Sequence, residues 1–127
     1  MRTSKITIDG KEYILCFSVR VILAFNDRYG GLEHVDAALS GGDIGENLKE
    51  AIWMISTMMD GGARYANLNG LYNPPPLTCD DLYDLCGIDD FKGLRGKISE
   101  TITEGRKVHV ELEPPKNGEA TQESRCV

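Results

Sequence analysis

The sequence predicts an α+β fold, in which a small antiparallel β-sheet packs on a helical core of four to five helices. Two β-rich runs flank Asp9-Gly10, a third alternating run covers residues 108–112, and apolar residues recur at helical intervals between them. The sheet would therefore combine an N-terminal hairpin with a C-terminal strand. The 127 residues suit one compact domain, which we place at residues 1–112, followed by a disordered polar tail at residues 113–127.

The hairpin is predicted over residues 6–17. Asp9-Gly10 suits a two-residue type I′ turn, because both central residues of that turn need a positive φ. The second strand has apolar residues on both faces, so we expect it to be covered on both sides. The first strand is expected to be a sheet edge, and free edges favour pairing with other chains. We therefore expect dimers or larger homo-oligomeric rings.

Two helices are predicted directly after the hairpin. Ser18 is the expected N-cap of a helix over residues 19–29, which Gly30-Gly31 would end. Apolar residues surround most of this helix, which is typical of a buried helix. A shorter helix is expected at residues 32–39.

The longest helix is expected to begin at Asp43 and to end at Gly61-Gly62. Its apolar stripe consists of Ile44, Leu48, Ile52, Ile55 and Met59. Trp53 lies about 100° away from Ile52 around such a helix. Two interpretations of Trp53 remain open: it packs under the hairpin or a loop, or it contacts a partner, since exposed aromatic residues anchor interfaces.

Residues 63–77 are expected to form a long loop, because they are rich in Asn, Gly, Pro and Tyr. Thr78 then caps a short helix, with Asp81 at the capping-box position. A last helix is predicted over residues 89–104, and the alternating strand at residues 108–112 follows it.

Sequence motifs for catalysis, cofactor binding or metal binding are absent. There is no Walker A, no G-x-G-x-x-G and no G-x-S-x-G motif. The four cysteines contain no C-x-x-C pair, so we expect reduced thiols and no zinc site. His34 and His109 are expected to be solvated. These observations predict a protein that is not an enzyme and has no cofactor or metal.

Charge and hydropathy narrow the class of partner. The net charge is −6 and the sequence pI is about 4.9, which argues against nucleic acid as the main partner and against a DNA-associated adaptor. No apolar run approaches the roughly 20 residues that a bilayer span requires. The interpretation is a cytoplasmic protein that acts through protein contacts.

An acidic run interrupts the second half of the chain. It consists of Asp80, Asp81, Asp84, Asp89 and Asp90. Calcium could bind such a cluster, but the EF-hand spacing is missing. Two further interpretations remain: carboxylates favoured near helix N-termini, and a negative docking patch.

The order of these motifs resembles that of the small tail assembly chaperones of long-tailed bacteriophages and prophages. The resemblance covers roughly residues 4–112. It is carried by the hairpin segment Ile6-Thr7-Ile8-Asp9-Gly10-Lys11-Glu12-Tyr13, the helix ending at Arg28-Tyr29-Gly30, the Trp53-bearing helix, the segment Leu77-Thr78-Cys79-Asp80-Asp81-Leu82-Tyr83-Asp84-Leu85, and the variable tail.

The resemblance implies a non-enzymatic role in the bacterial host cytoplasm. Such proteins bind the long helical tape measure protein, recruit tail tube subunits around it, and are absent from the finished particle. On this basis Trp53, Met54, Tyr65 and Tyr72 are candidate partner-binding residues. The alternative is a structural phage or prophage protein, such as a head–tail connector or a tail completion subunit, that stays in the particle.

Overall fold

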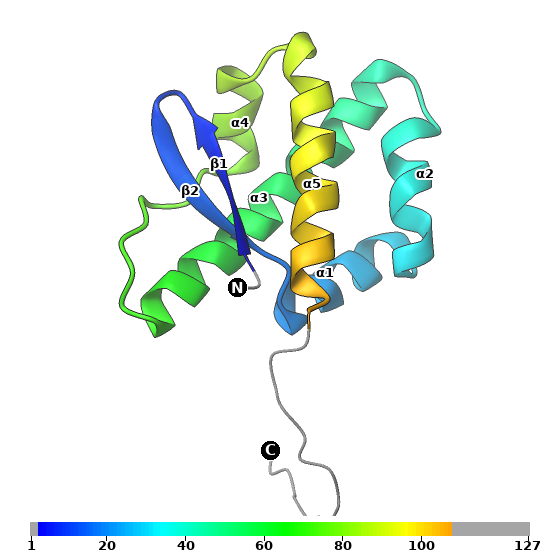
Figure 1. Ribbon diagram of the computed structural model, residues 1–127. Helices are drawn as coiled ribbons and strands as arrows, with labels where there is room; N and C mark the ends of the chain where they lie inside the picture. Colours follow the sequence, from blue (N-terminus) through cyan, green and yellow to red (C-terminus); the bar gives the residue numbers. More distant parts are fainter. Residues whose placement is uncertain (1–2, 108–127) are drawn as a thin grey trace, which may run out of the picture.

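The computed structural model describes residues 3–107 and has an α+β fold (Figure 1). The predicted hairpin and helical core are confirmed, whereas the predicted strand at residues 108–112 and the tail at residues 113–127 lie outside the described residues. The elements in chain order are β1 (Thr3–Ile8), β2 (Lys11–Cys16), α1 (Val19–Tyr29), the 3₁₀ helix η1 (Leu32–His34), α2 (Val35–Ser40), α3 (Ile44–Leu68), α4 (Cys79–Leu85), the 3₁₀ helix η2 (Ile88–Asp90) and α5 (Phe91–Gly105).

The hairpin has the predicted turn. Asp9 and Gly10 have φ values of 52° and 81°, which is the pair of positive φ angles that a type I′ turn requires. The strands pair antiparallel, from Ile8 opposite Lys11 to Thr3 opposite Cys16. The alternation of β1 therefore directs Ile6 and Ile8 into the core.

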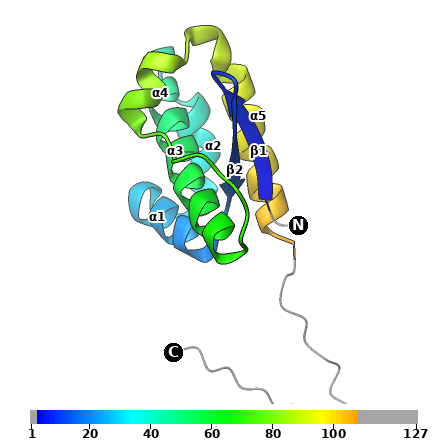
Figure 2. The same ribbon diagram turned by 90° about the vertical axis from the view of Figure 1, so that its left-hand side faces the viewer.

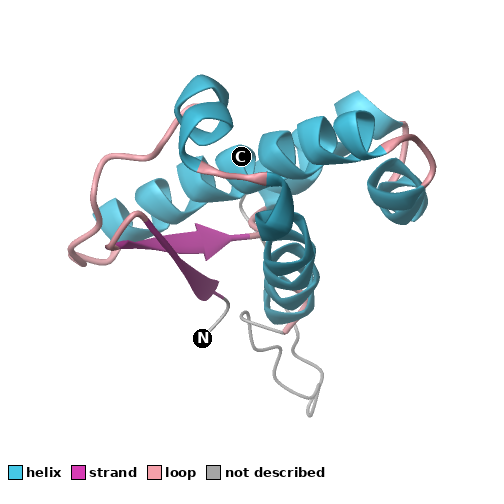
Figure 3. Cartoon of the chain, turned by 90° about the horizontal axis from the view of Figure 1, so that it is seen from above, coloured by secondary structure: helices cyan, strands magenta, loops and turns pink. Residues whose placement is uncertain are grey.

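The hairpin lies in the angle between α3 and α5, as the view from above shows (Figure 3). The turned view places the hairpin and α5 on one side of the molecule and α1 and α4 on the other, with α3 between them (Figure 2). Ser4 of β1 and Thr101 of α5 share a buried hydrogen bond between their hydroxyl groups. Since Thr101 Oγ1 also donates to the carbonyl oxygen of Lys97, Ser4 is the donor to Thr101.

Helix α3 is longer than predicted, because Gly61-Gly62 does not end it. The helix continues to Leu68, so the expected loop over residues 63–77 starts only at Asn69. A Cβ atom at position 62 would lie 1.7 Å from the carbonyl oxygen of Ile14. These glycines are there because β2 passes directly against the helix, and a side chain would push the strand away.

The predicted burial of α1 is also wrong. Only Val21 and Phe25 are buried, whereas Val19 and Leu23 are 68% and 59% exposed. The helix packs on α3 by one face, and its opposite stripe of apolar residues stays at the surface. The fully buried large side chains that form the core are Leu15, Phe17, Phe25, Met54, Ile55, Met58, Met59, Leu82 and Ile98.

Local signals for the short helices are confirmed. The segment predicted at residues 32–39 forms η1 and α2, which reach Ser40. Thr78 accepts from the N–H of Asp81, and Asp81 accepts from the N–H of Thr78, which completes the predicted capping box. Within residues 3–107, none of the helices has both the length and the apolar character that a membrane crossing requires.

Candidate protein-binding site

The structure separates the four candidate partner-binding residues. Met54 is 0% exposed, so its side chain belongs to the core and is not accessible to a partner of the folded chain; this part of the prediction is wrong. Tyr65 is half-buried on the last turns of α3. Tyr72 is 86% exposed in the loop after α3. Trp53 is half-buried and contacts α1.

Trp53 packs against α1, a contact that neither interpretation of this residue names. Its ring centroid lies 5.4 Å from that of Phe25 and 5.7 Å from that of Tyr29. The guanidinium of Arg28 lies 4.6 Å from the ring centroid, within the range of a cation–π contact. Trp53 therefore joins α1 to α3, and a partner contact through its remaining exposed surface stays a prediction.

A hydrogen-bonded network borders this aromatic cluster. Glu50 Oε1 accepts from Arg28 Nε at 2.9 Å and from Tyr29 Oη at 2.6 Å. The hydrogen bond from Arg28 holds the pKa of the Glu50 carboxyl below its ordinary value. Burial, together with the hydrogen bond to Glu50, raises the pKa of the Tyr29 hydroxyl. Glu50 is therefore ionised and Tyr29 neutral at pH 7, so the network holds two helices together.

An apolar groove lies between the first half of α3 and the segment of α4 and η2. We call it the α3–α4 groove, and its volume is about 310 Å³. Its lining residues are Gly45, Leu48, Lys49, Ile52, Tyr83, Cys86, Gly87 and Ile88. Tyr83 and Ile88 stay exposed beside it, and so does Ile44, one helical turn before Leu48.

Burial raises the pKa of the Cys86 thiol, with a smaller contribution from the charge of Asp90. The groove thus contains a protonated thiol at neutral pH, which is a poor nucleophile and a poor metal ligand. Its lining is mainly apolar, and the sequence alone did not predict this groove.

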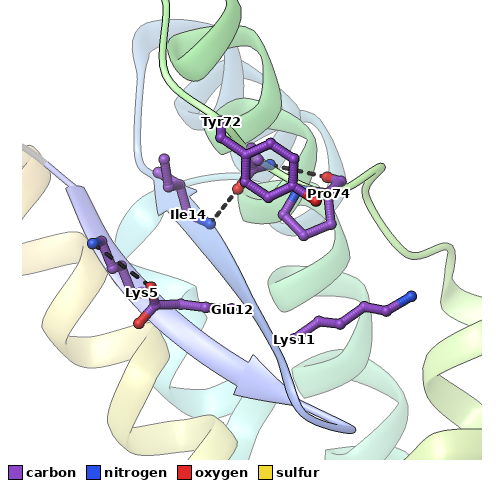
Figure 4. Close-up of a pocket in the computed structure, with 7 residues that line it drawn as sticks. Lys5, Lys11, Glu12, Ile14, Tyr72 and Pro74 are labelled. Atoms are coloured by element: carbon purple, nitrogen blue, oxygen red, sulfur yellow. Dashed lines mark hydrogen bonds and ion pairs between the residues drawn. The ribbon is translucent and has the colours of Figure 1, made fainter.

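A second apolar surface lies at the far end of α3. Leu68, Leu71 and Tyr72 are exposed there, and we call them the α3 tip. Beside it Asn73 Oδ1 accepts from the backbone N–H of Ile14 at 2.8 Å and so covers the outer edge of β2 (Figure 4). The adjoining pocket of about 240 Å³ is lined by Lys5, Lys11, Glu12, Ile14, Tyr72, Asn73 and Pro74.

The acidic run divides into two groups. Asp81 and Asp90 accept from the backbone N–H groups of Thr78 and Gly87, at 3.0 Å and 2.6 Å. These two carboxylates therefore stabilise helix starts, as one interpretation predicted. The exposed carboxylates of Asp80, Asp84 and Asp89 have no hydrogen-bond or ion-pair partner within residues 3–107.

Comparisons with models of protein families, with curated protein sequences and with solved structures found no match.

The remaining candidate groups are spread over the surface. His34 is exposed and lies 3.8 Å from Glu33, while His109 lies outside the described residues. Among residues 3–107, no three His, Cys, Asp or Glu side chains gather in a way that could hold a metal ion. Cys79 and Cys86 are free thiols.

Proposed function

We propose that this chain is a tail assembly chaperone of a long-tailed phage or prophage. It binds the tape measure protein in the host cytoplasm, without catalysis, and helps to recruit tail tube subunits during tail morphogenesis. The observation that carries the proposal is the apolar surface that remains exposed on a well-packed acidic domain, namely the α3–α4 groove and the α3 tip. A protein that keeps a long helical partner dispersed needs both apolar contact surface and net charge.

The segments that carry the resemblance contribute to one framework. Arg28 and Tyr29, at the end of α1, meet Trp53 of α3 through ring and cation–π contacts. Thr78 and Asp81 fix the start of α4, which forms one wall of the α3–α4 groove. These motifs thus support the proposal because they position α1 on α3 and fix the start of α4, which lines the α3–α4 groove.

Within the Arg28–Tyr29–Glu50 network, the two pKa shifts support a role without catalysis. General acid–base catalysis works best with a pKa near the working pH. The Arg28–Tyr29–Glu50 network instead moves the pKa of Glu50 down and that of Tyr29 up, away from neutrality.

The outer edge of β1 supports the proposed self-association. Ile14 directs its N–H away from β1, toward Asn73, so Ile14 and its partner Lys5 form a non-hydrogen-bonded pair. The backbone groups of Lys5 therefore point outward, and within residues 3–107 β1 pairs with β2 alone. An edge of this kind can pair with a second copy. Sedimentation of the full chain at high micromolar concentration tests this, and a monomer throughout would refute it.

Co-expression with the tape measure protein tests the main proposal. We expect the two proteins to co-purify, and the tape measure protein to precipitate when it is expressed alone. Mass spectrometry of purified particles should then show that this chain is absent. Detection at a stoichiometric level would instead favour the head–tail connector or tail completion subunit, and a tape measure protein that neither binds the chain nor needs it would refute the chaperone role.

A further inference from the structure

We infer that the α3–α4 groove binds one amphipathic helix of a partner protein, with an apolar stripe that is bordered by lysine and arginine. This inference rests on the proposed function and names the surface and the chemistry of the partner. Two properties of the groove lead to it: the spacing of its apolar residues and the charge of the residues next to it. A third observation is that helix α5 of this chain already buries its own apolar residues in the core.

The apolar spacing of the groove fits a helix. Ile44, Leu48 and Ile52 follow each other at intervals of four residues along α3, over about 12 Å at 1.5 Å per residue. Leu48 and Ile52 line the groove, where Ile52 is only 5% exposed, and Ile44 lies exposed one turn before Leu48. Tyr83 and Ile88 border the same groove from the other side. A partner helix with apolar residues at positions i, i+3 or i+4, and i+7 covers about the same length, as in other helix-in-groove complexes.

Three exposed carboxylates lie close in the sequence to the lining residues Tyr83 and Ile88. Asp80 and Asp84 flank Tyr83 on α4, and Asp89 follows Ile88. All three are exposed, and they have no ion-pair partner within residues 3–107. Lys49 is the cation of the groove lining. The apolar row provides contact area and the three carboxylates select a helix with basic flanks, because rim charges contribute more to specificity than to affinity.

A second copy of this chain does not fit this description. Its own α3–α4 groove has the same three aspartates, so a symmetric contact would place like charges together. Lys92, Arg95 and Lys97 make the first half of α5 basic, but its apolar residues Leu94 and Ile98 are only 4% and 1% exposed. Since α5 already uses its apolar stripe in the core, α5 of a second copy cannot be the occupant, and we assign the groove to a helix of a different protein.

Two synthetic helical peptides and the full-length chain test the inference. Both peptides have three heptads with leucine at the a and d positions; one has lysine at the flanking positions and the other has glutamate. In fluorescence anisotropy at low salt we expect the lysine peptide to bind at least tenfold more tightly than the glutamate peptide. Ile88→Ser should weaken its binding about tenfold, and Ile88 is 61% exposed, so the fold should tolerate the change.

Replacing carboxylates elsewhere on the surface controls for the general loss of negative charge. Joint replacement of Asp80, Asp84 and Asp89 by asparagine should remove most of the preference for the lysine peptide. Asp27→Asn with Asp36→Asn changes two exposed carboxylates on α1 and α2, away from the groove, and should leave that preference intact. Equal affinity of the unchanged chain for both peptides would overturn the inference, and so would an equal effect of the two sets of replacements.

The peptide result and the co-expression result separate the two proposals. If the chain co-purifies with the tape measure protein but binds neither peptide, the groove assignment is wrong and the chaperone role stands. If the lysine peptide binds in an Ile88-dependent way but the tape measure protein does not co-purify, the groove assignment stands and the chaperone role is refuted.

Discussion

Gly62 lies where α3 and β2 approach most closely, so Gly62→Ala is the sharpest test of how the hairpin is held. A Cβ atom there would lie 1.7 Å from the carbonyl oxygen and 2.4 Å from the carbonyl carbon of Ile14. Ordinary van der Waals contact begins at 3.4 Å, twice the first distance. The obstacle is backbone, which cannot rotate away as a side chain could, so β2 must shift as a whole.

Two opposing effects set the size of the loss. Overpacking a well-packed interior costs roughly 1–3 kcal/mol, and a clash with a strand backbone belongs at the upper end of that range. Alanine in place of glycine within a helix returns about 1 kcal/mol. We therefore expect the free energy of unfolding to fall by about 2 kcal/mol, which corresponds to a decrease in Tm of about 8 °C for a domain of this size.

Urea and thermal unfolding, followed by circular dichroism, measure this loss. Gly93→Ala is the matched control, because Gly93 also lies within a helix but an added Cβ atom there meets nothing within 4 Å. This control should raise the free energy of unfolding by up to about 1 kcal/mol. If Gly62→Ala also stabilised the protein, the close approach of α3 and β2 would be refuted.

Three further predictions concern the framework. Arg28 holds the pKa of the Glu50 carboxyl below its ordinary value of 4.5. The ionised carboxylate therefore stabilises the fold above that pH, and this stabilisation is lost as the pH falls through the lower pKa of the folded state. Glu50→Gln should flatten the acid side of a Tm–pH curve between pH 7 and 3. Asn73→Ala removes the acceptor for the N–H of Ile14 and should lower the free energy of unfolding in urea by about 1 kcal/mol, whereas Asn73→Asp keeps an acceptor and should lose less. Trp53→Ala should lower the free energy of unfolding in urea by about 3 kcal/mol, because packing against α1 is lost. If both the stability and the co-purification with the tape measure protein stayed unchanged, neither the packing role nor the partner contact of Trp53 would hold.

The features that the sequence predicts well are those decided by near neighbours. The turn needs a positive φ at Asp9 and Gly10 alone, and the capping box needs Thr78 and Asp81 three residues apart. In both cases the interacting groups lie within four residues of one another, so their pattern can be recognised without the rest of the fold.

The end of α3 shows where local patterns become insufficient. A glycine pair is compatible with a helix end and with a helix that another backbone crosses closely. The choice between them depends on β2, which lies more than 40 residues earlier in the chain. One signal was present: the buried positions Ile55, Met59, Gly62 and Ala66 continue the apolar stripe at intervals of four, three and four, once small residues are counted as part of it.

The candidate site was predicted less well than the fold, and adjacent residues show why. Trp53 and Met54 are neighbours about 100° apart on one helix, but one faces α1 and the other the centre of the core. No periodicity in α3 alone specifies that α1 crosses at Trp53, since this depends on the length of the connection through α2.

The acidic run is a second case in which the sequence alone cannot tell residues with different roles apart. In the sequence, helix-end electrostatics explains four of its five carboxylates, Asp80, Asp81, Asp89 and Asp90, without distinguishing among them. Hydrogen bonds in the fold assign Asp81 and Asp90 to backbone N–H groups and leave Asp80, Asp84 and Asp89 beside exposed apolar side chains. A carboxylate that accepts a hydrogen bond from a backbone N–H at a helix start cannot rotate freely toward a partner. A carboxylate without such a hydrogen bond can. Which carboxylates remain available for the proposed interaction therefore depends on which of them the helix starts already use, and the available ones lie next to Tyr83 and Ile88 in the sequence.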